Sequence, residues 1–474
     1  MSLVTPVPKP ARGNPPTGSP AGVTKGNQWA KQGGLSSRLV PLDRVARHHS
    51  GNSKLIKGKL HDAPADNLFP AFSATGQDVW RDAFDREGDA IIISAVGARC
   101  GKCFLARGRW SAIANTHVVW PDPEKAEIKF LWYLLNDEQF WIRSGSAQPF
   151  VAVRKTFEKE IFVPPLPEQR RIVAEIEKQF TRLEAGVSAL RRVQANLKRY
   201  RVAVLKAACE GCLVPTEAAL ARSPRSTKNG HSSYETGEAL LARILTERRQ
   251  NWQGRGQYKE PAAPETEKLA PLPEGWAWTS AEQLTMLVRS GSRGWGEFYS
   301  DTGLLFIRAQ DIKTDSLKLD GVARVTLPTK AEGMRSSVEN RDLLITITGA
   351  NVTKSAIVRG VSEVAFVSQH VALLKPVCRE AAAFQFLWII SPAHGRKTLE
   401  KWAYGAGKPG LSLEQVRSLP IALPPLAEQM RIVAEVERRL SVVEELESVV
   451  NANLQRATRL RQSILQRAFT GGLS

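Results

Sequence analysis

Two cysteine pairs have the spacing that most directly suggests chemistry in this sequence. Cys100 and Cys103 form one Cys-x-x-Cys unit, and Cys209 and Cys212 form a second. Four thiolates can bind Zn²⁺ tetrahedrally, and paired cysteines are common structural zinc ligands. The two pairs are, however, farther apart than in ordinary zinc ribbons. We therefore expect small buried thiols and no metal site, with zinc binding as the alternative.

Two glycine-rich stretches match phosphate-binding loops only in part. Residues 97–103 are one residue short of a P-loop and end in Cys, which offers no hydroxyl for Mg²⁺. Residues 405–410 spell Gly-x-Gly-x-x-Gly, but they follow an expected helix rather than a strand. Pro409 also removes an amide that a phosphate would bind. Neither stretch predicts nucleotide binding.

Two further fragments imitate motifs of DNA-modifying enzymes. Residues 14–17 (Asn-Pro-Pro-Thr) lack the aromatic residue that stacks on an extruded base in adenine methyltransferases. Residues 121–122 and 127–129 have the letters of a metal-dependent nuclease, but too little chain separates them for the intervening hairpin. The seven histidines are scattered, and no nucleophile elbow is evident. These fragments predict no catalytic site.

The elements that would position any site are set by an internal repeat. Residues 164–213 recur without a gap at 424–473, and 19 of the 50 aligned pairs are identical. Each copy predicts one long helix, with Glu168 or Glu428 in its first turn and Gly211 or Gly471 after its end. A double proline precedes each helix and keeps the chain extended there. About 43 residues at ~1.5 Å each give a rod of roughly 65 Å.

Apolar residues in both copies follow alternating steps of four and three, which is the pattern of a coiled-coil seam. Such a seam needs a partner in water, so we expect the two helices to pack on each other, antiparallel. Arg201 and Arg461 interrupt the seams at the same repeat position. The alternative is that each helix packs on its own globular domain. The seam residues are Ile176, Phe180, Leu183, Val187, Leu190, Leu197 and Val204 in the first copy, and Val436, Leu440, Val443, Val450, Leu454 and Ile464 in the second.

The repeat predicts an α+β protein with two mixed α/β domains, two long helices and a pseudo-two-fold relation between its halves. Residues 1–38 are basic, rich in proline and glycine and free of acidic residues, so we expect a disordered tail. The first domain covers 39–163 and the first long helix 164–214. A polar connector with a short helix covers 215–271, the second domain 272–423 and the second long helix 424–474.

The composition points to a polyanionic partner. Lys and Arg number 66 against 47 Asp and Glu, a formal charge of +19, and nucleic acid is the usual partner of such an excess. A basic surface that serves only solubility is the alternative. No apolar run suggests a membrane span or a signal peptide, and the five cysteines suit a reducing compartment. We expect a soluble, cytoplasmic protein.

Several of these residues together resemble the specificity subunit of a type I restriction-modification system. The resemblance rests on residues 164–173 and 423–433, on the helix ends at 211–213 and 471–473, and on Leu272-Pro273-Glu274-Gly275-Trp276. It implies two target recognition domains that read an asymmetric, bipartite site in double-stranded DNA, with the helices as spacer. It also implies two modification subunits and restriction subunits as partners. S-adenosylmethionine, ATP and Mg²⁺ would belong to those partners, and this chain would not be an enzyme.

The candidate DNA-binding residues are loop side chains. Arg and Lys favour guanine and Asn and Gln favour adenine, although a phosphate contact or plain solvation is an equally good account of any one of them. The rival hypotheses are a self-contained methyltransferase or nuclease with a divergent active site, and an interaction scaffold without a DNA role. The candidates are Ser73, Thr75, Arg99, Lys102, Arg107 and Gln148 in the first domain, and Arg308, Gln310, Asn351, Lys354 and Lys408 in the second.

Overall fold

The computed structural model describes residues 38–137, 139–145, 148–223, 234–253, 256–291, 293–328, 336–403 and 409–470. They form two compact units. Unit 1 holds the chain up to Leu190 and the segment from Ala452 onward, and unit 2 holds Arg191–Asn451. The tail that we expected to be disordered lies, apart from Arg38, outside the described residues. No described helix has both the length and the apolar character needed to cross a membrane.

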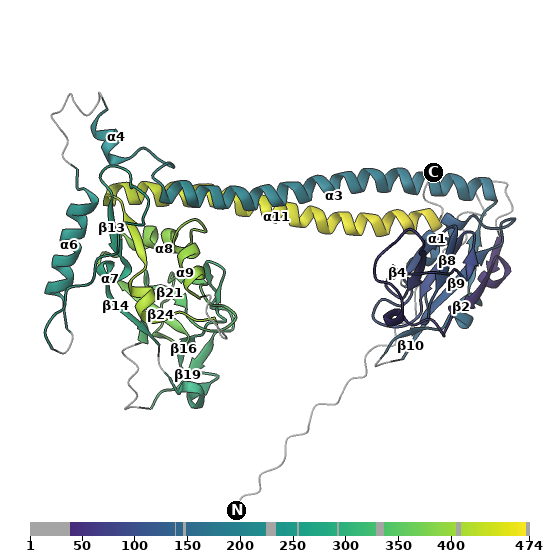
Figure 1. Cartoon of the computed structure of the whole chain (residues 1–474), viewed down its shortest axis with the longest axis horizontal. Coiled ribbons are helices and arrows are strands. Elements are labelled where there is room, and N and C mark those ends of the chain that lie inside the picture. The colour runs from purple at the N-terminus through teal and green to yellow at the C-terminus, as the bar shows by residue number, and fades with distance from the viewer. Residues whose placement is uncertain are drawn as a thin grey trace, which may run out of the picture. The chain divides into compact units, whose positions relative to one another are not determined.

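Unit 1 contains a mixed α/β domain, which we call head 1, and parts of two long helices (Figure 1). Its elements are β1 (Arg38–Pro41), η2 (Leu42–Arg44), β2 (Ala46–Ser50), η3 (Lys57–Lys59), β3 (Phe69–Ser73), β4 (Gly76–Arg81), β5 (Arg86–Glu87), β6 (Ala90–Ser94), β7 (Cys103–Ala106), β8 (Arg109–Ala112), β9 (Thr116–Pro121), α1 (Ile128–Leu135), β10 (Arg143–Ser144), β11 (Phe150–Val151), α2 (Val153–Phe157) and β12 (Glu160–Val163). Helix α3 (Leu166–Cys209) follows and continues into unit 2.

Unit 2 contains a connector and a second mixed domain, head 2. The connector includes α4 (Glu217–Ala221) and α6 (Gly237–Gln250). Head 2 comprises β13 (Ala277–Ser280), α7 (Ala281–Leu284), β14 (Thr285–Ser290), η4 (Trp295–Phe298), β15 (Tyr299–Ser300), β16 (Leu304–Ile307), β17 (Ile312–Lys313), β18 (Ser316–Leu317), β19 (Ala323–Val325), β20 (Ser337–Val338), β21 (Leu343–Thr346), β22 (Ser355–Ile357), β23 (Ala365–Val367), β24 (Val371–Pro376), α8 (Ala382–Ile390), α9 (Gly395–Ala403), α10 (Leu413–Arg417) and β25 (Pro420–Leu423). Helix α11 (Leu426–Thr470) begins in unit 2.

The two heads share the strand order of one sheet, whereas their second sheets have four strands in head 1 and five in head 2. A four-stranded antiparallel sheet has the order β2-β9-β6-β7 in head 1 and β14-β24-β21-β22 in head 2. A second sheet contains one parallel pair in each head, β3 with β8 and β16 with β23. The first strand of each head pairs with the strand before the long helix, β1 with β12 and β13 with β25. The duplication read from the helices therefore extends to the folds of the heads.

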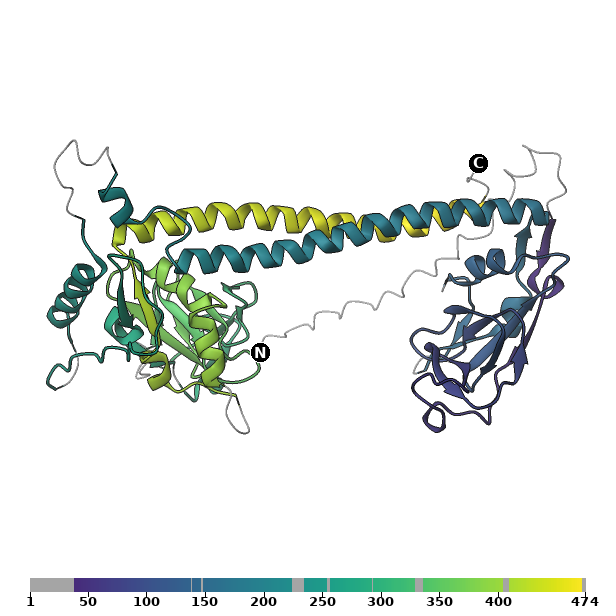
Figure 2. The same cartoon turned by 45° about the horizontal axis from the view of Figure 1, so that its top comes forward.

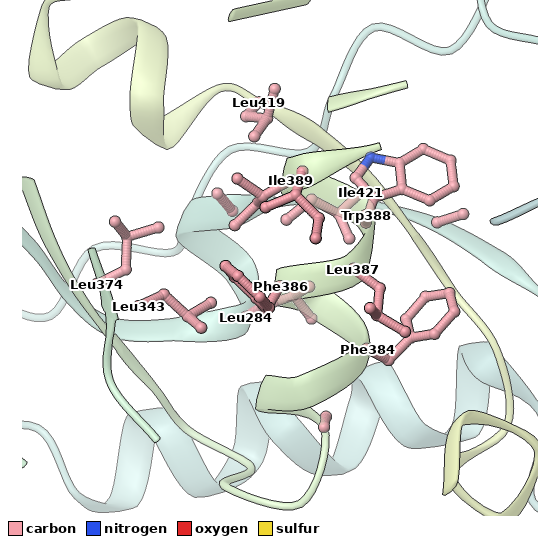
Figure 3. Close-up of a cluster of buried hydrophobic side chains, with 14 of the residues drawn as sticks. Leu284, Leu343, Leu374, Phe384, Phe386, Leu387, Trp388, Ile389, Leu419 and Ile421 are labelled. Carbon is pink, nitrogen blue, oxygen red and sulfur yellow. The ribbon is translucent and has the colours of Figure 1, made fainter. Parts of the chain in front are cut away.

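Strands β6 and β21 lie in the interior of the two four-stranded sheets and consist mostly of apolar residues. All five residues of β6 are buried, and their side chains alternate between two core clusters on opposite faces of the sheet. Strand β21 does the same in head 2, where Leu343 lies in the core under α8 and Leu344 in the core under the second sheet. Figure 3 shows Leu343 and Leu374 on the side of the sheet where Phe386 and Leu387 of α8 pack. Each head is thus a helix layer and two sheet layers.

Segments of α3 and α11 lie side by side in both units and run in opposite directions (Figures 1 and 2). In unit 2, Gln194 donates to Asn451 at 3.1 Å, and farther along α3 Arg201 faces Glu447 and Glu444, which precede Asn451. In unit 1, Arg461 lies 3.3 Å from Glu184. The antiparallel pairing predicted from the seams is confirmed within each unit. All thirteen seam residues are buried or half-buried.

The repeat also appears in how the helix ends enter the two cores. In unit 1 the core contains Ile172 and Ile176 from the start of α3, together with Ile464 and Ala468 from the end of α11. The unit 2 core contains Ile432 and Val436 from the start of α11, together with Val204 and Ala208 from the end of α3, and these four residues hold the same repeat positions. Each head therefore packs on the beginning of its own helix and the end of the other.

The two arginines that interrupt the seams make related contacts. Arg201 faces Glu444 at 3.8 Å, and its counterpart Arg461 faces Glu184, the counterpart of Glu444. The Arg461 guanidinium also lies 4.1 Å from the centroid of the Phe180 ring. A cation on an aromatic face, with a carboxylate beside it, explains why a charge is accepted at a seam position.

The connector attaches unit 2 to the start of α11 in a way that the first repeat copy does not share. Glu428 is fully buried and accepts hydrogen bonds from the Trp276 indole at 2.9 Å and from the Glu217 amide at 2.8 Å. Arg431 pairs with the Glu217 carboxylate. In the first copy Glu168 instead pairs with exposed Arg171 one turn along the same helix. Helix α6, expected over 238–250, buries Leu240 and Ile244 in the unit 2 core.

Candidate nucleic-acid interface

The heads present two hairpin loops with the same backbone conformation. Residues 95–102 join β6 to β7, and residues 347–354 join β21 to β22. The same four backbone hydrogen bonds close both loops at positions 252 apart. In head 1 the amides of Ser94, Gly101, Cys100 and Lys102 donate to the carbonyl oxygens of Lys102 (2.9 Å), Ser94 (2.8 Å), Gly97 (3.0 Å) and Arg99 (3.2 Å), respectively. In head 2 the amides of Thr346, Thr353, Val352 and Lys354 donate to the carbonyl oxygens of Lys354 (2.8 Å), Thr346 (2.9 Å), Gly349 (3.0 Å) and Asn351 (3.1 Å), respectively.

The two loops carry different side chains on this common backbone. Lys102 and Lys354 occupy the same position, and Arg99 occupies the position of Asn351. Arg99 is exposed, and Lys102 Nζ lies 5.4 Å from the Phe104 ring centroid. In head 2, Lys354 Nζ instead donates to Asn351 Oδ1 at 2.8 Å. At these two positions head 1 carries two cationic side chains, whereas head 2 carries one lysine that donates to an asparagine side chain.

A second segment lies against each hairpin. In head 1 the Gly97 amide donates to Pro149 O at 2.8 Å, which brings exposed Gln148 next to the hairpin that carries Arg99 and Lys102. The Val151 amide also donates to Ala95 O at 2.9 Å, and in head 2 the corresponding bond runs from the Leu411 amide to Ile347 O at 2.8 Å. Lys408, the expected counterpart of Gln148, lies outside the described residues.

In head 2 another loop joins the cluster. Asn351 Nδ2 donates to Ala309 O at 3.2 Å, so Arg308 and Gln310 lie beside the hairpin. Arg308 forms a two-point contact with Asp311, with both nitrogen–oxygen distances 3.0 Å, and this carboxylate raises the pKa of Arg308. Its guanidinium is thus already occupied, whereas Gln310 is exposed. The structure brings together four of the five candidates of head 2.

The remaining candidates of head 1 lie in turns. Ser73 is buried, and its hydroxyl is 2.8 Å from that of exposed Thr75. Lys57 pairs with Asp78 at 2.5 Å and donates to Thr75 at 3.3 Å. Burial would raise the pKa of Asp78, but hydrogen bonds from Lys57 and the two hydroxyls hold it below its usual range. The Ser73 hydroxyl therefore supports the turn, and exposed Lys57 is a cation that the sequence analysis did not select.

Arg107 and an aromatic site complete this surface of head 1. Arg107 lies in the β7–β8 turn, 4.0 Å from Asp89. The guanidinium carbons of Arg47 and Arg86 each lie 5.6 Å from the Trp120 ring centroid, a site that the sequence analysis missed. Pairing of β2 with β9 sets Arg47 opposite Trp120, and no local sequence pattern reveals a pairing between strands so far apart in the chain.

Comparisons with known proteins agree with these features. A family model for the type I restriction modification DNA specificity domain matches residues 80–189. The chain is 26% identical to the EcoBI specificity subunit of Escherichia coli over 66% of its own length, and it spans only 58% of that relative. It is 22% identical to the EcoDI specificity subunit of Escherichia coli over 93% of this chain and 91% of that one.

The last match covers both heads and both long helices. The chain is similar to a type I restriction enzyme specificity subunit over most of its length. Its fold is shared by a solved chain from work on the assembly and conformational transition of a type I R-M system, with a TM-score of 0.57, 18% identity and coverage of 92% of this chain and 98% of that one.

The two Cys-x-x-Cys pairs are the residues that could support metal or thiol chemistry in this chain. Among the described residues no group of three or more His, Cys, Asp or Glu side chains could hold a metal ion. Cys100, Cys103 and Cys209 are buried, and Cys212 is exposed. Burial raises the pKa of the Cys103 thiol and raises that of Cys209 to about 12, so neither is a ready thiolate.

Proposed function

We propose that this chain is the non-catalytic DNA-recognition subunit of a type I restriction-modification complex and that it reads a bipartite, asymmetric site. One observation carries the proposal: the heads share the strand order of their four-stranded antiparallel sheets and the hairpin conformation but differ at Arg99 and Asn351, where the shared loop presents its side chains. Two domains with similar folds but different loop side chains can recognise different half-sites. The repeated helices, with their shared seam pattern, can act as the spacer between these domains.

Binding would combine sequence-independent and sequence-dependent contacts. The formal charge of +19 supports phosphate neutralisation as the main source of affinity. Arg99, Lys102 and Gln148 in head 1, and Gln310 and Lys354 in head 2, are the side chains through which base reading is proposed, with Asn351 positioning Lys354.

The chemistry of the complex would lie in partner subunits. We propose that two modification subunits and restriction subunits assemble on this chain and that S-adenosylmethionine, ATP and Mg²⁺ bind to them. A cytoplasmic location goes with that role. The alternative of a self-contained methyltransferase or nuclease has no specific observation in its favour, because the near-motifs lack the side chains that their chemistry requires.

The test is to lengthen the proposed spacer. Seven residues are inserted after Val193 in α3 and after Asn453, its counterpart in α11, and the complex with modification subunits is reconstituted. A heptad adds about 10 Å of helix, or roughly three base pairs of DNA. Mapping methylated bases should then show a gap longer by about three base pairs between unchanged half-sites. Altered half-sites with an unchanged gap would refute the proposal, and methyl transfer or cleavage by the chain alone would favour the enzymatic alternative.

A further inference from the structure

A turn of head 1 lies at the base of the hairpin formed by residues 95–102. It joins β8 to β9 and contains Asn115, a residue that the sequence analysis did not select. The Ala95 amide donates to Asn115 O at 2.9 Å, and the Ala95 carbonyl accepts from the Val151 amide at 2.9 Å. The turn and the segment that contains Gln148 are therefore both hydrogen-bonded to the start of this hairpin.

The backbone of the turn is fixed by contacts within head 1. The Ile113 amide donates to Phe72 O at 3.0 Å, and the Thr116 hydroxyl closes the turn by donating to Ile113 O at 2.7 Å. Asn115 has a φ of +65°, in the left-handed region that asparagine adopts more readily than most residues with a side chain. The position of the Asn115 side chain on the surface is thus set by the fold of head 1.

The side chain of Asn115 is exposed and uncommitted. Its amide forms no hydrogen bond with any residue that the structure describes. A free amide offers a donor and an acceptor side by side, and adenine presents the complementary pair, the N7 acceptor and the N6 donor, in the major groove. Guanine presents two acceptors at that edge, which would leave the amide oxygen of Asn115 without a partner.

The equivalent turn of head 2 carries a committed side chain. The Ile347 amide donates to His370 O at 2.9 Å, which places His370 at the position of Asn115. The His370 Nδ1 atom lies 2.5 Å from the Thr348 hydroxyl oxygen, and its Nε2 atom lies 3.3 Å from Gln369 Nε2. Both ring nitrogens are therefore engaged within head 2. At this position the heads differ in residue type and in whether the side chain is free to bind a base.

We propose that Asn115 reads one adenine in the half-site of head 1, through a two-point contact of its amide with N6 and N7, and that His370 makes no such contact in head 2. This inference rests on the proposed function and adds to it one residue and the base that this residue selects. Because the amide is uncharged, a contact of Asn115 with a phosphate would add no charge neutralisation. The asymmetry of the site then comes from this turn as well as from the hairpins.

The experiment uses the complex of the full chain with modification subunits and sequences the DNA that it retains from a randomised double-stranded library. Asn115→Gly removes the amide, and glycine adopts the positive φ without strain. Asn115→Asp keeps the shape of the side chain but offers only acceptors, which match the N4 donor of cytosine. We expect Asn115→Gly to reduce the adenine preference at one position by about tenfold and Asn115→Asp to shift that preference towards cytosine.

The matched control is His370→Ala, at the corresponding position of head 2. It should leave the half-site that contains this adenine unchanged, and the two Asn115 variants should leave the other half-site unchanged. Thermal unfolding of each variant verifies that a changed preference is not a loss of structure.

Three results would overturn the inference. Asn115→Gly could leave every base preference as in the wild type, it could weaken binding equally for all sequences, as loss of a backbone contact would, or it could change both half-sites. A failure of the proposed function is distinguished by the wild type itself, which would then retain DNA without a bipartite sequence preference.

Discussion

Glu428 should matter far more to stability than its repeat counterpart Glu168, although the two hold the same position at the start of the repeated helices. Substitution of Glu428 by Ala leaves two donors, the Trp276 indole and the Glu217 amide, without their acceptor in a buried site. An unsatisfied buried donor costs about 1–3 kcal/mol, so we expect unit 2 to lose about 3 kcal/mol. Glu168 makes one partly exposed ion pair with Arg171, and Glu168→Ala should cost unit 1 about 0.5 kcal/mol.

The two units can unfold separately, so the free energy must be read for each. Hydrogen exchange resolved by peptide across a urea series provides this, because it reports the opening of each unit through its own amides. Equal destabilisation by Glu428→Ala and Glu168→Ala, within about 1 kcal/mol, would refute the reasoning. So would a Glu428→Ala effect that appears in unit 1 alone.

The same carboxyl gives unit 2 a pH dependence. Burial raises the pKa of Glu428 above 4.5, and the hydrogen bonds from Glu217 and Trp276 oppose that rise. The folded state therefore binds this proton more tightly than the unfolded state does. As pH rises from about 4.5 through the raised pKa, unit 2 should lose stability in the wild type, and this loss should be absent in Glu428→Ala. A wild-type stability that instead rises in this window, relative to the variant, would contradict the assignment.

Two further predictions use contrasts within the chain. Gly186 in α3 has open space where a Cβ would lie, so Gly186→Ala should stabilise unit 1 by about 0.5–1 kcal/mol. Gly237→Ala would instead place its Cβ 2.2 Å from Leu423 O and should destabilise unit 2. Thermal unfolding measures whether each variant is more or less stable than the wild type. Lys354→Ala should weaken DNA binding and reduce its salt slope by about one, whereas Asn351→Ala should weaken binding with little change in slope, because the amide positions the lysine but carries no charge. Equal slopes for these two variants in salt-dependent titrations would contradict the latter prediction.

The sequence predicted the parts of this fold that depend on local pattern. The steps of four and three placed the helices and their seam, and the β-branched run at 90–94 placed an interior strand. The 260-residue register implied that the halves are alike, and the four-stranded antiparallel sheets of the two heads have the same strand order. What local pattern could not supply is pairing between distant strands. The parallel pair of β3 with β8 and the contact of Arg47 with Trp120 both depend on such pairing.

For the candidate site, too, the sequence predicted some features and missed others. Lys102 and Lys354 could be matched from the sequence because each follows an apolar run that ends in glycine, and the hairpins place both at one backbone position. Their surroundings were not predictable, because Phe104 lies near one lysine and Asn351 holds the other. Residue type suggested that Asn351 could read adenine, yet its amide is bonded at both ends within head 2. A side chain that is free in a sequence pattern can be committed in the fold.

Glu168 and Glu428 show most directly where sequence reasoning ends. Both occupy the first turn of a long helix, where the helix dipole favours an acid, and that argument treats them alike. Residues 215–217, which follow the first copy of the repeat, fold onto the start of the second copy. One glutamate is therefore buried under the connector while the other pairs with an exposed arginine. Because the chain is linear, a duplicated sequence need not give duplicated environments, and the halves of this chain differ most where the connector and the loops meet the repeat.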